Sequence, residues 1–228
     1  INRALALKEL GRPHEALASC DKAIHLRPDS ADAYNNRGLA LFALQRPADA
    51  LASYERALAL DPTSAEACNN RGRTLYELGR IDEARASFDR AVGIRPNFAQ
   101  ARWNRAQAML LAGDLAQGWC EHEWRLKAHQ ELQRAFAQPL WLGERPLAGK
   151  TILLHAEQGL GDTLQFCRYA PLVAAQGGRV VLEGQKPLVD LMRGLPGVAA
   201  VVARGEPLPD FDLHCPLLSL PLAFGTRL

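Results

Sequence analysis

The chain of 228 residues carries 27 basic and 25 acidic side chains, a net charge of +2, and 48% of its residues are apolar. This charge balance argues against nucleic acid or an anionic membrane surface as a partner. No apolar run reaches the roughly 18 residues that a membrane-spanning helix needs, so we expect no membrane insertion.

The five cysteines lie far apart and form no CxxC pair, which argues against a disulfide framework and against a zinc or other metal site. We therefore expect a reducing compartment, the cytoplasm. The chain begins without Met and ends within an incomplete pattern, so we expect a fragment of a longer protein. The cysteines are Cys20, Cys68, Cys120, Cys167 and Cys215.

A 34-residue repeat organises the N-terminal half. The segment AYNNRG at residues 33–38 recurs as ACNNRG at residues 67–72. A fixed period of this length is typical of stacked helix hairpins, in which each repeat buries its apolar face against its neighbours. Further positions recur at the same spacing, namely Ala50 and Ala84, Tyr54 and Phe88, and Pro62 and Pro96.

These residues resemble the tetratricopeptide-repeat (TPR) family, whose helix pairs carry small residues, an aromatic residue and a final proline at these positions. The resemblance implies an α-helical superhelix of about four hairpins over residues 1–132, with the first repeat cut at its N-terminus. The last repeat departs from the family pattern. Gly118, His122 and Arg125 replace an alanine, the aromatic residue and a second alanine.

Position 6 of each repeat is an asparagine, and the resemblance implies that this first helix of each hairpin, helix A, lines a concave groove. An amide both donates and accepts hydrogen bonds, which suits the backbone of an extended peptide. The TPR region of O-linked N-acetylglucosamine transferase is similar at this position, which implies a peptide or protein ligand. Alternatively, the asparagines bond to the neighbouring helix and hold the repeats together. They are Asn2, Asn36, Asn70 and Asn104.

Position 7 is an arginine in each repeat, and we include Arg37, Arg71 and Arg105 among the candidate groove residues. Two roles are open for them. They either neutralise nearby acidic side chains, which we prefer, or contact the ligand.

After about residue 132 the 34-residue period ends. Pro139, Gly143 and Pro146 interrupt any helix, so residues 133–149 are predicted to be a connector. Residues 150–228 then alternate between apolar strands and helices. We expect strands at 151–155, 179–183, 198–202 and 211–215, and helices at 163–176, which Pro171 kinks or breaks, and at 187–193. This order predicts a partial α/β Rossmann-like domain with a parallel sheet.

A glycine-rich turn, QGLGD at residues 158–162, follows the first strand. It does not fit a P-loop, because the Gly-Lys-Thr at 149–151 precedes the strand instead of following it. A dinucleotide fingerprint would use Gly159 and Gly161, with Glu183 as the ribose-binding acid, but Leu164 replaces its third glycine.

The same turn, followed by a helix that opens with Thr-Leu, resembles the ADP-heptose:lipopolysaccharide heptosyltransferases, which have the two-lobed GT-B architecture. The resemblance covers about residues 148–226 and implies that Asp162 is a candidate base for the acceptor hydroxyl. It also implies a nucleotide-sugar donor for the full-length parent, although the donor-binding lobe is absent from this chain. No cofactor is expected in the fragment itself. Alternatively, Asp162 only caps its helix.

Together the two halves are similar to a bacterial family of TPR proteins with a heptosyltransferase-like C-terminal region. The first functional hypothesis is a scaffold that binds a peptide or protein in its groove. The second is a glycosyltransferase whose array selects a protein acceptor, and the third, a nucleotide-dependent oxidoreductase, ranks last.

Overall fold

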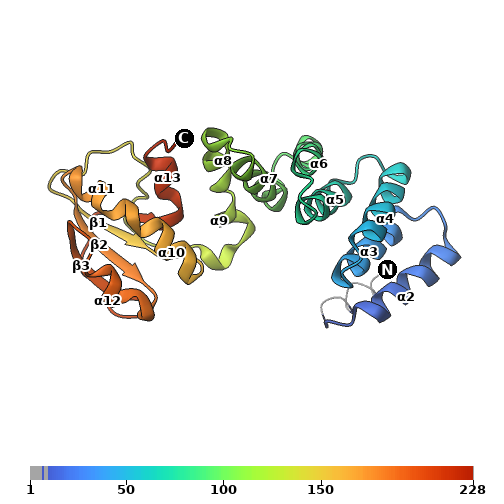
Figure 1. The fold of residues 1–228 in the computed structure, drawn as a ribbon, viewed down its shortest axis with the longest axis horizontal. Helices are drawn as coiled ribbons and strands as arrows, with labels where there is room; N and C mark the ends of the chain where they lie inside the picture. The colour runs from blue at the N-terminus through green and yellow to red at the C-terminus, as the bar shows by residue number, and fades with distance from the viewer. Residues whose placement is uncertain (1–6, 8–9, 228) are drawn as a thin grey trace. The chain divides into compact units, whose positions relative to one another are not determined.

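The computed structural model describes Leu7 and residues 10–227, which fall into two compact units, Ile1–Ala128 and His129–Leu228 (Figure 1). The first unit is helical and the second contains a parallel sheet. The predicted fold class, TPR hairpins followed by a small parallel α/β domain, is confirmed.

Paired antiparallel helices build the N-terminal unit. Three complete hairpins follow one another along the chain, α3 with α4, α5 with α6 and α7 with α8, and α2 precedes them (Figure 1). The bounds are α2 Pro13–Leu26, α3 Ala31–Ala43, α4 Pro47–Leu60, α5 Ala65–Glu77, α6 Ile81–Ile94, α7 Ala99–Leu111, α8 Leu115–His122 and the short α9 Arg125–Ala128.

The recurring small and aromatic residues form the interior of each hairpin. Tyr54 and Phe88 are 0% and 1% exposed, and each ring lies against a glycine of helix A. A Cβ atom added to Gly38 would lie 2.4 Å from the Tyr54 ring, and one added to Gly72 would lie 2.6 Å from the Phe88 ring. The aromatic residue therefore requires a glycine opposite it, because cores accommodate extra volume only with strain.

The turns between helix A and helix B share one geometry. Gln45, Gly79 and Gly113, spaced 34 residues apart, have φ values of 58°, 73° and 84°. The next residue donates its N–H back into the helix, as in Arg46 N to Leu41 O and Arg80 N to Leu75 O, both at 2.9 Å. This is the Schellman type of helix end, in which a left-handed residue lets the last carbonyls find donors.

A parallel four-stranded sheet forms the second unit, with strand order β3-β2-β1-β4. The bounds are β1 Thr151–His155, β2 Arg179–Gly184, β3 Val198–Ala203 and β4 Leu213–Pro216. The chain moves outward from β1 to β3 and then returns to the other side of β1. The order reverses between β1 and β4, which is the position where open parallel sheets bind ligands beyond the carboxyl ends of the strands.

The helix predicted at 163–176, with a kink or break at Pro171, is interrupted in the structure and starts three residues earlier. The structure has α10 Leu160–Phe166, a 3-10 turn Cys167–Tyr169 and α11 Ala170–Ala175. Pro171 lies in the first turn of α11, where its missing N–H costs nothing. In a continuous helix its ring would clash with the carbonyl of residue 167.

The helix predicted at 187–193 is also shorter than expected. It is a 3-10 turn Lys186–Leu188 followed by α12 Val189–Met192. The unit ends with the turn Leu217–Ser219 and α13 Leu220–Ala223.

Candidate functional site

The helix-A face of the N-terminal unit, formed by α3, α5 and α7, carries the predicted asparagines. Asn70 Nδ2 donates to Asn35 Oδ1 at 2.9 Å, and Asn104 Nδ2 donates to Asn69 Oδ1 at 2.8 Å. Each bond joins position 6 of one repeat to position 5 of the preceding repeat. Asn36 is 9% exposed, and Asn2 lies outside the described residues.

These bonds match the alternative interpretation, in which the asparagines link successive repeats. These bonds use only part of the hydrogen-bonding capacity of the side-chain amides, because an asparagine side chain has two N–H donors and a carbonyl that accepts two bonds. For Asn104, one N–H is used toward Asn69 and the carbonyl accepts one bond from Gln100 Nε2 at 3.1 Å. Each linking asparagine therefore retains capacity for a further partner.

The arginines at position 7 form a second periodic contact. Arg37 donates to Asp21, 16 residues before it, and to Ser53, 16 residues after it, both at 2.8 Å. One guanidinium thus joins helix A to the helix B of its own repeat and to that of the preceding repeat. Its fork of donors suits this double contact.

We call this double contact of a position-7 arginine with two B helices the clamp, and it recurs in the next two repeats. Arg71 bonds Ser87 at 2.7 Å and lies 3.6 Å from Glu55. Arg105 contacts Asp89 at 3.0 Å and Glu121 at 2.9 Å.

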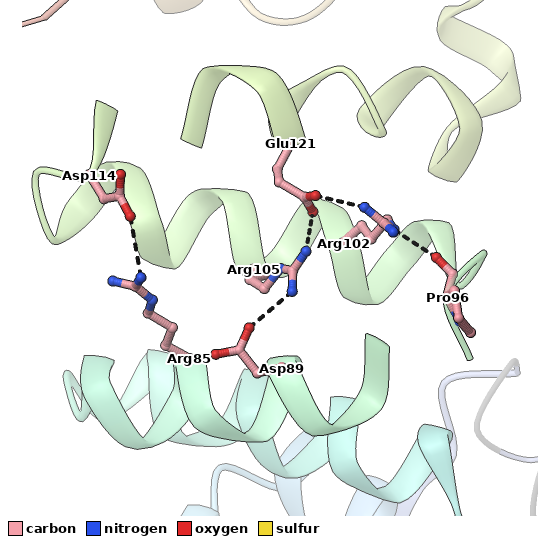
Figure 2. A network of polar contacts seen from close by, with 7 residues as sticks. All are labelled: Arg85, Asp89, Pro96, Arg102, Arg105, Asp114 and Glu121. Carbon is pink, nitrogen blue, oxygen red and sulfur yellow. Dashed lines mark hydrogen bonds and ion pairs between the residues drawn. The ribbon is translucent and has the colours of Figure 1, made fainter. Parts of the chain in front are cut away.

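Figure 2 shows the last clamp within a wider network. Arg102 contacts Glu121 at 2.7 Å and the Pro96 carbonyl at 2.6 Å, while Arg85 reaches Asp114 at 3.2 Å. The position-7 arginines therefore bind helix-B side chains and link neighbouring helices, and a contact of these arginines with a ligand stays a prediction.

A pocket of about 260 Å³ opens on the helix-A face between α5 and α7. Three side-chain amides line it, together with three aromatic rings and the guanidinium of Arg73, which lies over the Phe42 ring at 4.6 Å. Its lining residues are Arg73, Tyr76, Glu77, Phe88, Gln100, Trp103, Asn104 and Gln107.

Among the sequence-predicted groove residues, Asn104 lines this pocket. The prediction based on the position-6 asparagines did not include four other lining residues, namely Gln100, Arg73, Gln107 and Glu77. They stand at positions 2, 9, 9 and 13 of their repeats, on the helical face that also carries position 6. The helical spacing was therefore a sufficient signal for them.

In the C-terminal unit, Asp162 lies half-buried at the start of α10, and its Oδ2 accepts a 3.2 Å hydrogen bond from Gly159 N. This is the reciprocal half of a capping box. A Cβ atom on Gly161 would meet nothing within 4 Å, and one on Gly159 would lie 3.7 Å from Asp162 Oδ2. Internal packing therefore does not require glycine at either position.

The position of Glu183 does not support its predicted role as the ribose-binding acid of a dinucleotide site. The carboxylate of Glu183 forms an ion pair with Arg134, and the residue is 1% exposed. In this structure the Glu183 carboxylate is therefore paired with Arg134 and is not available to a ribose hydroxyl.

Within the described part of the chain, no group of three or more His, Cys, Asp or Glu side chains has the arrangement of a metal site. No described helix has both the length and the apolar character to cross a membrane. The five cysteines are free thiols, four of them buried. Burial raises the pKa of the Cys20 thiol to about 11, so this thiol stays protonated and unreactive at neutral pH.

Family models described as tetratricopeptide repeat match residues 1–65 and residues 41–110. Neither range enters the C-terminal unit. The N-terminal unit is therefore a TPR scaffold. Comparison with curated proteins gives no match.

Several solved structures share this scaffold. PilF of Pseudomonas aeruginosa is 26% identical with a TM-score of 0.53, over 57% of this chain and 60% of that protein. PilW, described as a type IV pilus biogenesis factor, is 31% identical with a TM-score of 0.50, over 55% and 60%. MamA, at 24% identity and a TM-score of 0.50, covers 56% and 74% and shows the fold alone.

Proposed function

We propose that this protein is an interaction scaffold whose helix-A face binds an extended peptide or a segment of a protein. The observation that carries the proposal is the pocket between α5 and α7, because its lining combines side-chain amides with aromatic rings. Amides pair with both the N–H and the C=O groups of a peptide backbone, and aromatic rings contact its side chains. Asn104 joins this pocket to the row of asparagines.

The charges of the pocket support a peptide of mixed character. Arg73 and Glu77 lie on its wall with opposite charge, and the other polar groups are neutral. A groove of this kind recognises the backbone of a peptide more than the charges of its side chains. The proposal also places the protein in the cytoplasm, which the free cysteines favour.

A peptide selection tests this proposal. The full 228-residue chain is used to select binders from a random peptide library displayed on phage, and the affinity of a selected peptide is measured by calorimetry. Gln107→Ala is expected to weaken binding about three- to tenfold, the contribution of one or two hydrogen bonds. Asp82→Ala, on the exposed side of α6, is the matched control and should bind like the wild type. Equal affinity of both variants would contradict the proposal.

A second candidate function is a GT-B glycosyltransferase of the heptosyltransferase type, in which the array selects a protein acceptor. What favours it is the position of the turn, since Gly159 to Asp162 follow the carboxyl end of β1, beside the reversal of strand order between β1 and β4. In this candidate Asp162 takes the proton of the acceptor hydroxyl, and the nucleotide sugar binds a second lobe of the full-length parent.

Asp162→Asn separates catalysis from capping. The asparagine amide oxygen can still accept the Gly159 N–H, but it is not a base. In the full-length parent, loss of sugar transfer with an unchanged melting temperature would support the candidate, and undiminished turnover would rule it out.

A further inference from the structure

Titratable side chains gather at the carboxyl ends of three neighbouring strands. Glu183 of β2 is in register with His155 of β1, which is in register with Pro216 of β4. His214 lies two residues before Pro216. Because side chains alternate along a strand, Glu183, His155 and His214 lie on the same face of the sheet. Strands of a buried parallel sheet are normally apolar on both faces, so this row is unusual for a core.

The row is closely connected. His155 Nε2 lies 3.3 Å from His214 Nδ1, and the two rings have centroids 5.4 Å apart. His155 is 2% exposed and Glu183 is 1% exposed. Burial, and then the nearby Arg134 guanidinium, lower the pKa of His214, which favours the neutral ring. A neutral imidazole is what a hydrogen bond between two histidines requires.

A segment that begins with a 3-10 turn, Gln130–Leu132, and then runs extended covers this row. We call residues 129–141 the strap. From residue 133 to residue 140, exposed and half-buried residues alternate, as expected for extended chain lying on a surface. The even-numbered residues face the protein and the odd-numbered residues face solvent. At its far end the strap joins the edge of the sheet, where Trp141 N donates to His214 O at 2.8 Å.

Two inward side chains of the strap, Arg134 and Phe136, contact the row. The Arg134 guanidinium pairs with the Glu183 carboxylate and also lies over the Phe136 ring at 4.6 Å. The Phe136 ring packs against His155 and His214, with centroid distances of 5.4 Å and 4.9 Å. Its third neighbour is Phe211, at 5.3 Å. These contacts span β2, β1 and β4.

We propose that the strap is a built-in cover that closes the carboxyl-end crevice of the sheet, with Arg134 and Phe136 occupying the positions that a ligand would take. The crevice is opened when these two side chains leave, which exposes a carboxylate and two imidazoles at the reversal of strand order. That combination of a crevice and titratable groups is typical of a binding site rather than of a packed core. The inference does not depend on the peptide groove, and its test uses no peptide ligand of the groove.

The strap also has features of a releasable segment. Residues 134 and 136 contact the sheet through their side chains, whereas residues 139–141 hold β4 through backbone hydrogen bonds. Residues 129–138 can therefore leave without breaking the ladder between β1, β2 and β4. Leaving also returns Glu183 to water, which avoids a buried unpaired charge.

The test is chemical access to His155 in the full chain. Modification by diethyl pyrocarbonate is followed by mass spectrometry, with the exposed His14 and His25 as internal references. The double variant Arg134→Ala with Phe136→Ala is expected to accelerate modification of His155 about tenfold or more relative to these references. The control is Gln133→Ala, an outward residue of the same strap, which should leave the rate unchanged.

Hydrogen exchange and a peptide added in trans complete the test. In the double variant, amides of the strap should exchange faster while those of β1 and β2 stay protected. A synthetic peptide of residues 129–141 should then slow His155 modification again. An unchanged His155 rate would overturn the proposal. Equal loss of protection throughout β1 and β2 would also overturn it, because the strap would then be part of the core.

Discussion

The side-chain amide of Asn104 donates a 2.8 Å hydrogen bond to the side-chain carbonyl of Asn69, and both residues are buried. The two asparagines belong to α7 and α5, which are successive A helices. The equivalent pair one repeat earlier is Asn70 with Asn35, at 2.9 Å. An asparagine pair therefore fixes the register of neighbouring repeats on the same face that carries the pocket.

Removing one member of the buried pair should destabilise the array. Asn69→Ala leaves the Asn104 amide without this acceptor, and we expect a loss of about 1–3 kcal/mol in the free energy of unfolding, as for an unsatisfied buried group. Asn104→Ala should cost a similar amount. Urea unfolding of both single variants and the double variant gives the coupling, expected at about 1 kcal/mol. Strictly additive losses would show that the bond contributes nothing.

The turn at Gln45 holds a non-glycine residue in the left-handed region, with φ of 58°. Left-handed backbone costs an ordinary L-residue roughly 1–2 kcal/mol. Gln45→Gly should therefore stabilise the protein by about 1 kcal/mol, since glycine adopts this conformation without strain at a helix end. The change is measured as a rise in the melting temperature.

The equivalent turn one repeat later supplies the control. Gly79 has φ of 73° and open space where a Cβ atom would lie, so Gly79→Ala adds backbone strain without a clash. It should lower the stability by about 1 kcal/mol. If Gln45→Gly and Gly79→Ala shifted the melting temperature in the same direction, the turn geometry described above would be incorrect.

His122 should make the array sensitive to acid. It is 7% exposed, and its ring lies edge-on to the Trp119 ring with the ring centroids 5.6 Å apart. Burial, and then the positive charge of Arg125, lower the pKa of His122 to about 3. A histidine in the unfolded chain titrates near 6.5, so between about pH 6.5 and 3 the unfolded state binds a proton that the folded state excludes. The free energy of unfolding should fall with decreasing pH in this window, by up to about 1.4 kcal/mol per pH unit.

His122→Phe tests this dependence, because it restores the aromatic residue of the repeat pattern and removes the titrating group. Urea unfolding at a series of pH values should show a shallower slope below about pH 6.5 for this variant. The exposed His25, changed to Gln, is the control and should keep the wild-type slope. An unaltered slope in His122→Phe would assign the acid sensitivity to other groups.

The repeat period was enough to predict the helix hairpins, because residue type and spacing agreed at the buried positions. Tyr54, Phe88 and the glycines opposite them are examples. The partners of the asparagines were not predictable in the same way. Position 5 is Asn35 and Asn69 but Trp103 in the last repeat, and a bond between repeats depends on how two helices pack rather than on spacing within one.

In the C-terminal unit the four strands were predictable as short apolar runs, and so was the break near Pro171, whereas the start of the helix predicted at 163–176 was not. Asp162 and Gly159 start α10 three residues earlier through their cap, and Pro171 begins a new helix. From the sequence, the residues of the strap were predicted only as the end of the TPR array, up to residue 132, and the start of the connector, from residue 133. Its alternating exposure is set by the sheet beneath it, and that contact between distant segments leaves no periodic signal in the sequence.

The most direct test of the peptide-groove account is the NMR spectrum of the side-chain amides while a selected peptide is added to the full chain. The account predicts that the largest shifts fall on Asn70, Asn104, Gln100 and Gln107, which lie on the helix-A face. Shifts confined to Gln45 in its turn, to Gln117 of α8, or to the amides of the C-terminal unit would contradict it.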